Sequence, residues 1–248
     1  MEHRIVDISL GYQHWLALDD AGLVYGLGKN NRYQLGEFVK EVTENTNDAE
    51  PFLLAQHIPF DEPIVQMKAG KFHSLFLTES GKLYSVGSNL HGQTGFSNTI
   101  YDRIKNPTMI NTDGIEIVKI DWGNHHSLVL DSEGNLYGFG SKLWGQIDGE
   151  LDSIRREQCN LVQIKLPSDS KVVDFKANNV KSCAFLENGE VWFWGGFFYR
   201  SNNRARIDGF NLLNEEDGIP NDHRIVDYCM GFGHETVMTE KNDDVLDI

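Results

Sequence analysis

The stretch Gly70–Gly95, "GKFHSLFLTESGKLYSVGSNLHGQTG", determines the fold because the chain repeats its pattern. Copies of the surrounding pattern begin at five places: Ile5, Ile64, Ile117, Val172 and Ile225. Successive copies are offset by 53 to 59 residues. A repeat of this length indicates one structural unit per copy, stacked on its neighbours to form a continuous core.

The copies share residue types at aligned positions. Three copies have a glycine, a histidine, a second glycine and a glutamine in the same order: Gly11, His14, Gly22 and Gln34; Gly70, His73, Gly81 and Gln93; Gly123, His126, Gly134 and Gln146. The fourth copy has Asn178 and Lys181 in place of the first glycine and the histidine, whereas the fifth keeps Gly231 and His234. The repeat is therefore strong in three copies and degenerate in two.

Each copy begins with apolar residues that alternate with polar ones, as Val6, Ile8 and Leu10 do in the first copy. The alternation recurs at 118–122, 173–177 and 226–230. It predicts a strand with one face on a core and one toward solvent. A run that is apolar on both faces, a turn ending in glycine and a returning strand follow. About four strands per repeat of this length are typical of a β-propeller blade.

The order of these motifs resembles the repeat of the regulator of chromosome condensation family. The matching elements are a Gly-x-x-His-Ser strand, an acidic turn ending in glycine, a Leu-Tyr strand and an Asn-x-x-Gly-Gln turn, and Gly70–Gly95 shows all of them. The resemblance covers nearly the whole chain and implies an all-β propeller. Propellers of this family usually have seven blades, and this chain offers four full repeats with a partial blade at each end.

We therefore expect one repeat domain over residues 1–248. The predicted parts are a half-blade at 3–18, blades at about 23–78, 83–130, 136–186 and 191–240, and a terminal strand at 243–248. If the two ends pair, they close a small ring of five blades. If they do not pair, the structure is an open arc whose exposed edges need another chain.

The bulk composition narrows the class of protein. The chain has 248 residues, a net charge of −15 and a pI of about 4.9, so its surface repels phosphate backbones and nucleic-acid binding is not expected. Its three cysteines form no CxxC pair, which favours a reducing compartment. We find no signal peptide and no apolar run long enough to span a membrane. We expect an intracellular, cytoplasmic protein, with a cytoskeletal, nuclear or organellar complex as further possibilities.

The recurring polar residues do not predict chemistry. The histidines His14, His73, His126 and His234 occupy the same place in successive blades, so the architecture keeps them apart, and we expect each imidazole to bond to a neighbouring backbone group. Serines that follow the histidine position diverge from it along the strand. Cys183 lies in an apolar run and is expected to be a small buried hydrophobe. We therefore predict no catalytic, cofactor-binding or metal-binding residues.

The stretch "WFWGGFFYR" at 192–200 divides at its glycines. Trp192, Phe193 and Trp194 align with a returning strand and are expected to pack in a blade. The aromatic and arginine residues that follow are the predicted partner-binding residues: Phe197, Phe198, Tyr199, Arg200, Arg204 and Arg206. The alternative is a local filler that covers the edge of the fourth blade.

Two functions follow as hypotheses. The first is a non-catalytic interaction or scaffold propeller in a multi-subunit complex, whose partners are other proteins and include a chain that completes the propeller. The second comes from the resemblance alone, because the founding member of the family promotes guanine-nucleotide exchange on the small GTPase Ran. In that case a propeller face would grip a GTPase and disfavour its bound nucleotide.

Overall fold

The computed structural model is built from β-strands. It describes residues 3–40, 55–149, 157–200, 203–206, 209–213, 219–220, 223–230 and 235–241, with the backbone alone at 197–200, 203–206, 229, 230 and 235. All regular secondary structure in these segments is β-strand, which confirms the predicted all-β class. The described segments contain no helix that could cross a membrane.

Four four-stranded antiparallel sheets follow one another along the chain. The first contains β1 (Ile5–Leu10), β2 (His14–Asp19), β3 (Val24–Gly28) and β4 (Gln56–Ile58). The second contains β5 (Ile64–Ala69), β6 (His73–Thr78), β7 (Leu83–Ser88) and β8 (Arg103–Met109). The third contains β9 (Ile117–Trp122), β10 (His126–Asp131), β11 (Leu136–Ser141) and β12 (Glu157–Gln163).

The remainder of the chain is less regular. The fourth sheet contains β13 (Val172–Asn178), β14 (Lys181–Leu186), β15 (Val191–Trp194) and β18 (Asn211–Leu212). Two hairpins complete the described strands: β16 (Phe197–Arg200) with β17 (Asn203–Arg206), and β19 (His223–Met230) with β20 (Glu235–Lys241).

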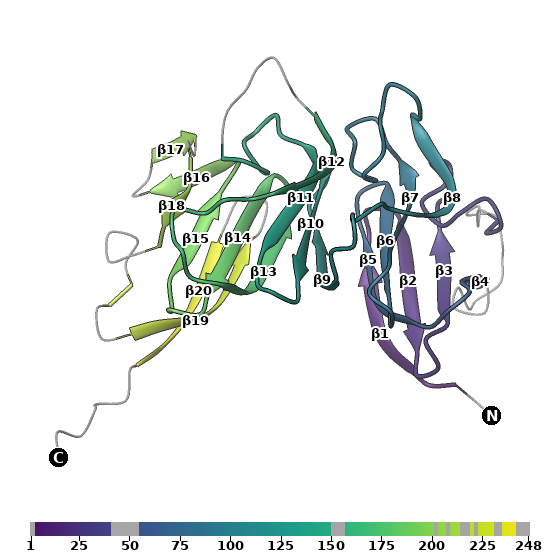
Figure 1. Ribbon diagram of the computed structural model, residues 1–248, viewed down its shortest axis with the longest axis horizontal. Helices are drawn as coiled ribbons and strands as arrows, with labels where there is room; N and C mark the ends of the chain where they lie inside the picture. The colour runs from purple at the N-terminus through teal and green to yellow at the C-terminus, as the bar shows by residue number, and fades with distance from the viewer. Residues whose placement is uncertain are drawn as a thin grey trace.

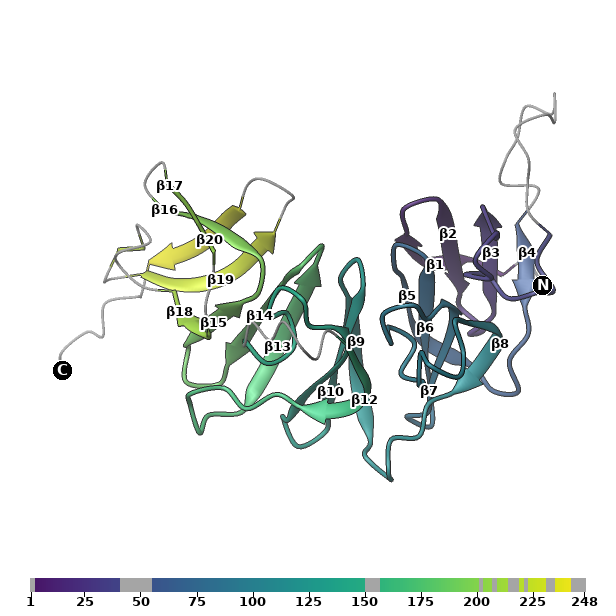
Figure 2. The ribbon, with the colours of Figure 1, turned by 90° about the horizontal axis from the view of Figure 1, so that it is seen from above.

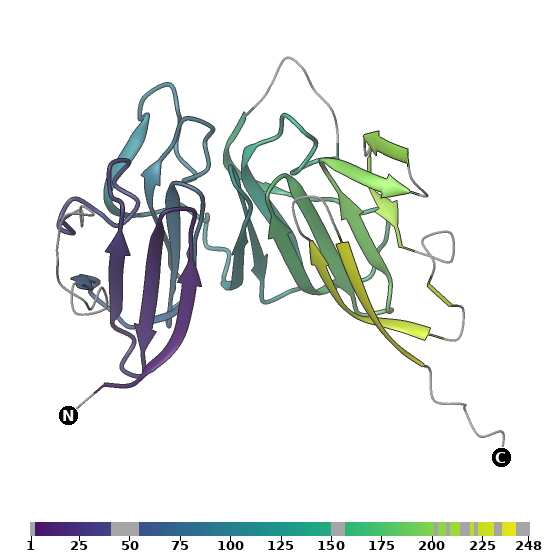
Figure 3. The same cartoon turned by 180° about the vertical axis from the view of Figure 1, so that it is seen from behind.

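The sheets lie along an arc in chain order (Figures 1 and 2). The first strand of each sheet contacts the first strand of the next one, from β1 to β5, from β5 to β9 and from β9 to β13. The first sheet and the β19–β20 hairpin lie at opposite ends of the arc, as the view from behind also shows (Figure 3). The described residues therefore form an open partial propeller. The predicted terminal strand at 243–248 lies outside them.

The sheets divide the chain at other points than the sequence predicted. After β3 the chain returns to the same sheet, and β4 pairs with β3 through Val24↔Ile58 and Gly26↔Gln56. Residues 3–18 therefore supply the first two strands of a complete sheet, where we expected a half-blade. The two-stranded unit at the other end is β19–β20.

The core lies between the sheets. We call the face that a sheet turns toward the preceding sheet its leading face, and the opposite face its trailing face. Leu75 and Leu77 on the trailing face of the second sheet pack with Ile120 and Val129 on the leading face of the third. Equivalent clusters join the first sheet to the second, the third to the fourth, and the fourth to β19–β20. Each sheet thus depends on its neighbours for burial.

The predicted inward face of each first strand needs a correction. Val118, Val173 and Val226 were expected on the core side, but they are exposed, whereas Ile117 and Val172 are buried. The reason is a register shift near the start of the strand pair, seen between Val172 and Asp174 and at the equivalent points of the other sheets. A β-bulge adds one residue to the first strand. The side chains that precede the bulge therefore point to the opposite face from the one that strict alternation predicts.

We expect Phe175→Ala to destabilise the chain strongly, because this side chain is 1% exposed between the third and fourth sheets. Removing a buried phenylalanine costs about 3–5 kcal/mol. Val173→Ala is the matched control, since Val173 lies on the same strand and is 56% exposed, and its cost should stay below about 0.5 kcal/mol. Urea unfolding followed by tryptophan fluorescence measures both. Equal losses in the two variants would contradict the proposed packing.

Candidate functional site

The recurring histidines join neighbouring sheets. The Nε2 atoms of His14, His73 and His126 lie 3.0, 3.2 and 3.0 Å from the serine hydroxyls of the following sheet, which are those of Ser74, Ser127 and Ser182. Each serine hydroxyl also donates to the backbone carbonyl of a glutamine in the preceding sheet: Gln34, Gln93 and Gln146. Since the hydroxyl proton is used in this way, the serine accepts from the histidine N–H.

The glycines and glutamines of the repeat hold this arrangement in place. The imidazole of His73 lies on Gly70 so closely that a Cβ added there would be 2.3 Å from the ring, and Gly11 and Gly123 have the same role. The Gln93 side chain folds back and accepts from the N–H of His91, which orients the carbonyl that Ser127 uses. The repeated motif is therefore a joint between sheets.

Burial lowers the pKa of His14, His73 and His126 to about 3, so all three are neutral at physiological pH. Each histidine bonds through Nε2 to a serine side chain of the next sheet, and His14 and His126 also have the expected backbone hydrogen bond, with His73 and Lys181 respectively. His234 lies outside the described residues. Each of the three serines is bonded to the histidine of the preceding sheet and not to the histidine position of its own strand. The arrangement stabilises the stack of sheets.

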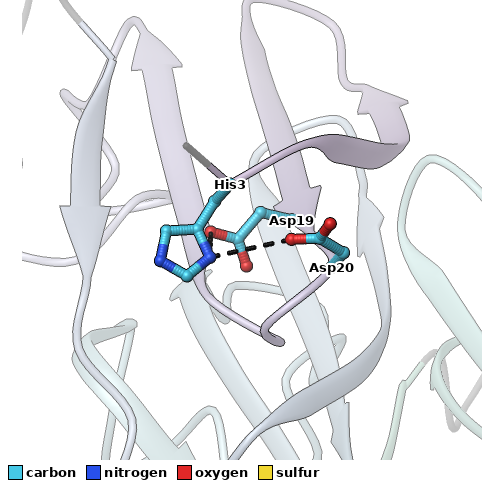
Figure 4. Close-up of side chains that lie close together, drawn as sticks. All are labelled: His3, Asp19 and Asp20. Carbon is cyan, nitrogen blue, oxygen red and sulfur yellow. Dashed lines mark ion pairs between the residues drawn. The ribbon is translucent and has the colours of Figure 1, made fainter. Parts of the chain in front are cut away.

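One group of side chains has the composition of a metal site. Among the described residues, His3, Asp19 and Asp20 form the cluster of three potential ligands, with the His3 Nδ1 atom 3.8 and 3.6 Å from the two carboxylates (Figure 4). The Asp19 carboxylate already accepts from the backbone N–H groups of Ala21 and Leu23 and from the Tyr25 hydroxyl.

The third sheet shows the same turn without a histidine. Asp131 accepts from the N–H groups of Glu133 and Asn135 and from the Tyr137 hydroxyl. The geometry of Asp19 is therefore explained by its hairpin turn, and exposed carboxylates beside it are common without a bound ion.

The residues of the fourth sheet lie where the sequence predicted. Phe193 and Trp194 are buried, and the Trp194 indole donates to the Gln146 carbonyl at 2.9 Å. Cys183 is fully buried among apolar side chains, and burial raises the pKa of its thiol, which keeps it protonated and unreactive.

The predicted partner-binding residues lie together on one hairpin. β16 and β17 pair antiparallel with Phe197 opposite Arg206 and Tyr199 opposite Arg204. The backbone thus brings the aromatic and arginine positions to one two-stranded unit beside the fourth sheet (Figure 1). The side chains of Phe197, Phe198, Tyr199, Arg200, Arg204 and Arg206 lie outside the described part of the structure.

A second surface was not predicted from the sequence. In the first sheet, we call the face that is equivalent to the leading faces of the later sheets the open face. Four large apolar side chains are exposed on it: Ile5 (46%), Ile8 (52%), Leu10 (59%) and Trp15 (40%). Leu10 and Trp15 lie directly opposite each other on β1 and β2, so the patch crosses both strands. We expected Ile8 and Leu10 to face a core, and that expectation is wrong because no described sheet lies against this face.

The sequence contained one signal for this surface. Trp15 occupies the position at which the next three copies have the serine of the inter-sheet bond, namely Ser74, Ser127 and Ser182. In the first copy the small hydroxyl acceptor of the joint is therefore absent from the leading face. The substitution was visible in the alignment of the copies, but its meaning required the geometry of the joint.

Comparison with known proteins identifies the repeat. The description "Regulator of chromosome condensation (RCC1) repeat" matches residues 21–77 and 64–93. The human RCC1-like G exchanging factor-like protein is 31% identical over 197 residues, which cover 78% of this chain and 41% of that protein. The guanine nucleotide exchange factor SRM1 of Saccharomyces cerevisiae is 30% identical over 207 residues, which cover 78% of this chain and 42% of SRM1.

The solved structures agree with the sequence match. The structure of Prp20p of Saccharomyces cerevisiae is similar to that of this chain, with a TM-score of 0.79 at 25% sequence identity. Prp20p was studied together with its binding to Gsp1p and histones. The match covers 98% of this chain and 57% of Prp20p. The sheets are therefore propeller blades of one known type, and the chain spans about two fifths of the length of the curated relatives named here.

The buried histidines predict how stability depends on pH. Their pKa is about 3 in the folded chain and about 6.5 when it unfolds, so the unfolded state binds more protons between these values. Stability should be complete above pH 6.5 and should fall as the pH drops toward 3. Each histidine contributes up to about 1.4 kcal/mol per pH unit.

The variant His73→Gln, which cannot take up this proton, should be less stable at pH 7 and should lose stability less steeply between pH 6.5 and 5. Urea unfolding at several pH values measures the slope, and the exposed His57→Gln controls for the substitution at pH 7. An unchanged slope in His73→Gln would contradict a neutral buried imidazole.

Proposed function

Because the chain is built from repeats of the regulator of chromosome condensation type, we propose that it is a non-catalytic protein-interaction module that serves as a scaffold subunit of a larger assembly. The open face carries this proposal. A contiguous apolar patch on two strands of a sheet marks a site of protein association. Isolated cysteines such as Cys159 and Cys183, neither of them in a disulfide, support a cytoplasmic location.

Equivalent strand positions within the chain differ in their burial, which supports an interaction site. Ile8 is 52% exposed, whereas Met67 and Ile120, which occupy its position in the second and third sheets, are fully buried under a preceding sheet. The same apolar strand pattern thus forms a contact between sheets in the second and third sheets. A face with this design and no described neighbour is suited to contact another protein.

Crosslinking of the tagged full chain in the cells that make it tests the proposal. We expect peptides of this chain to be joined to peptides of a small set of other proteins, identified by mass spectrometry. Size-exclusion chromatography with light scattering should show a complex heavier than the 28.2 kDa chain in the same extract. Recovery of the chain as a monomer with internal crosslinks alone would contradict the proposal.

The β16–β17 hairpin is proposed as a second contact surface. Aromatic and arginine residues supply much of the binding energy at protein interfaces. Replacing Phe197, Phe198 and Tyr199 together by serine should weaken the crosslinked complex several-fold and leave the circular dichroism spectrum and the thermal midpoint unchanged. Unfolding of this variant would instead identify the hairpin as a filler that covers the fourth sheet.

Guanine-nucleotide exchange is the second candidate function, and the names of the relatives favour it. Release of a fluorescent guanine nucleotide from purified Ran, with and without the chain, separates the two functions. We expect no acceleration, because the chain spans about two fifths of those relatives. A rate close to that of a full-length exchange factor assayed in parallel would replace the scaffold proposal.

A further inference from the structure

We propose that a group of five side chains, which we call the lysine cluster, binds an aspartate or glutamate side chain of a partner protein. Its members are Tyr12, Lys71, Phe72, His91 and His125. This inference rests on the proposed function, and it names the chemistry of one contact that the interaction module makes. It depends on the geometry of the cluster, on the unbalanced charge of its lysine and on the distribution of charge between the two ends of the sheets.

Three connections between strands bring the cluster together. Lys71 lies in the turn between β5 and β6, His91 follows β7, and His125 precedes β10. The imidazole rings of His91 and His125 meet edge to face, with their centroids 4.5 Å apart. The Lys71 Nζ atom lies 5.6 and 5.5 Å from the ring centroids of Tyr12 and Phe72. Cation–π contacts of this kind position an ammonium group without neutralising its charge.

The charge of Lys71 is not balanced by a neighbouring carboxylate. Among the described residues, Lys71 takes part in no ion pair, whereas Lys82, Lys119 and Lys142 each have an acidic partner. The Glu157 carboxylate approaches the cluster on its histidine side, where Oε1 lies 3.9 Å from the Nδ1 atom of His91. A lysine beside two imidazoles disfavours a bound metal cation and favours an anion.

His125 supplies a hydrogen-bond donor. Its Nδ1 atom is buried and has no hydrogen-bond partner in the described part of the chain. Burial, together with the charges of His91 and Lys71, lowers the pKa of His125 to about 4, so the ring is neutral at physiological pH. A buried N–H without an acceptor is rare, so the one proton of the neutral ring belongs on Nε2. Lys71 thus provides the charge that attracts an anion, and His125 provides an N–H for it to accept.

The two ends of the sheets differ in charge. Successive strands are antiparallel, so the turn after the first strand of a sheet and the turn after the second lie at opposite ends. The turns after the first strands, at 11–13, 70–72, 123–125 and 179–180, contain Lys71 and no acidic residue. The end that carries the lysine cluster therefore attracts an acidic group, and the other end repels it. The turns at that other end, which follow the second strands, contain acidic residues and no lysine or arginine over 19–22, 78–81, 131–134 and 186–189: Asp19, Asp20, Glu79, Asp131, Glu133 and Glu187.

A short acidic segment of a protein fits this cluster better than a nucleic acid does. A nucleic acid brings a continuous row of phosphates, which a chain of net charge −15 repels. A protein segment can place one carboxylate on Lys71 and an apolar side chain on the ring of Tyr12, which is 65% exposed. Aromatic residues are enriched at protein interfaces. The inferred partner therefore carries an aspartate or glutamate next to an apolar residue.

Zero-length crosslinking with a carbodiimide tests the contact, because this reagent joins a carboxylate to a touching lysine amine as an amide. The tagged full chain is treated in an extract of the cells that make the protein. We expect an amide between Lys71 and an aspartate or glutamate of another protein, located by mass spectrometry. Lys82 is the internal control, since its Nζ atom lies 2.7 Å from the Glu62 carboxylate and should form an intramolecular amide. An amide at Lys82 with none at Lys71 would overturn the inference.

The peptide found at Lys71 is then synthesised with a fluorescent label, and its affinity for the purified full chain is measured by anisotropy. Lys71→Gln should weaken binding about fivefold or more, whereas Lys71→Arg keeps the charge and should stay within about twofold. His125→Phe keeps a ring but removes the donor, and it should weaken binding about threefold or more. Lys82→Gln at the opposite end is the matched control and should leave the affinity unchanged, with circular dichroism confirming that each variant is folded. Equal affinity of Lys71→Gln and the unaltered chain would refute the proposed contact.

Other outcomes also decide the matter. Amides from Lys71 to carboxylates of this chain alone would identify a contact within or between copies and exclude the proposed partner. Crosslinks to other proteins from the open face or the β16–β17 hairpin, with none from Lys71, would remove this inference and leave the interaction module standing. Absence of crosslinks to other proteins from every position would remove both.

Discussion

The structure depends on the burial of each sheet's leading face by the trailing face of the sheet before it. No sheet has a core of its own, because Leu75 and Leu77 belong to the same cluster as Ile120 and Val129 of the next sheet. At the three joints among the four four-stranded sheets, a histidine, a serine and a glutamine carbonyl add buried hydrogen bonds. The hydrophobic contact supplies the stabilisation, and the buried polar bonds fix the relative position of the two sheets.

Because each leading face is buried by the sheet before it, the two ends of the arc differ from the interior. Among the described residues, no sheet lies against the first leading face or the last trailing face of this stack. The first leading face keeps the apolar character of the interior faces, whereas the last trailing face presents Thr236, Met238 and Glu240. The two ends of the described stack therefore differ in character, since one is apolar and the other is mixed.

The sequence indicated much of the fold and little of the site. The repeat, the strand alternation and the buried run predicted an all-β propeller, and the predicted separation of His14, His73 and His126 into successive sheets is confirmed. Local patterns did not predict the bulge at Val172–Asp174, which exposes Val173 and buries Val172. Nor did they predict that β4 completes the first sheet, because that pairing depends on where a long connection returns.

By itself the sequence determined the blade type, because the residues of the joint recur at fixed spacing and each has one steric or hydrogen-bonding role. Gly70 has to be small beneath His73, and Gln93 has to fold back on its own turn. The tertiary structure alone decided which apolar strand faces are buried. Ile8 and Ile120 lie in equivalent strands, and they differ because a sheet lies against one of them. Burial depends on which residues are neighbours in space, and the sequence pattern of one strand does not specify those neighbours.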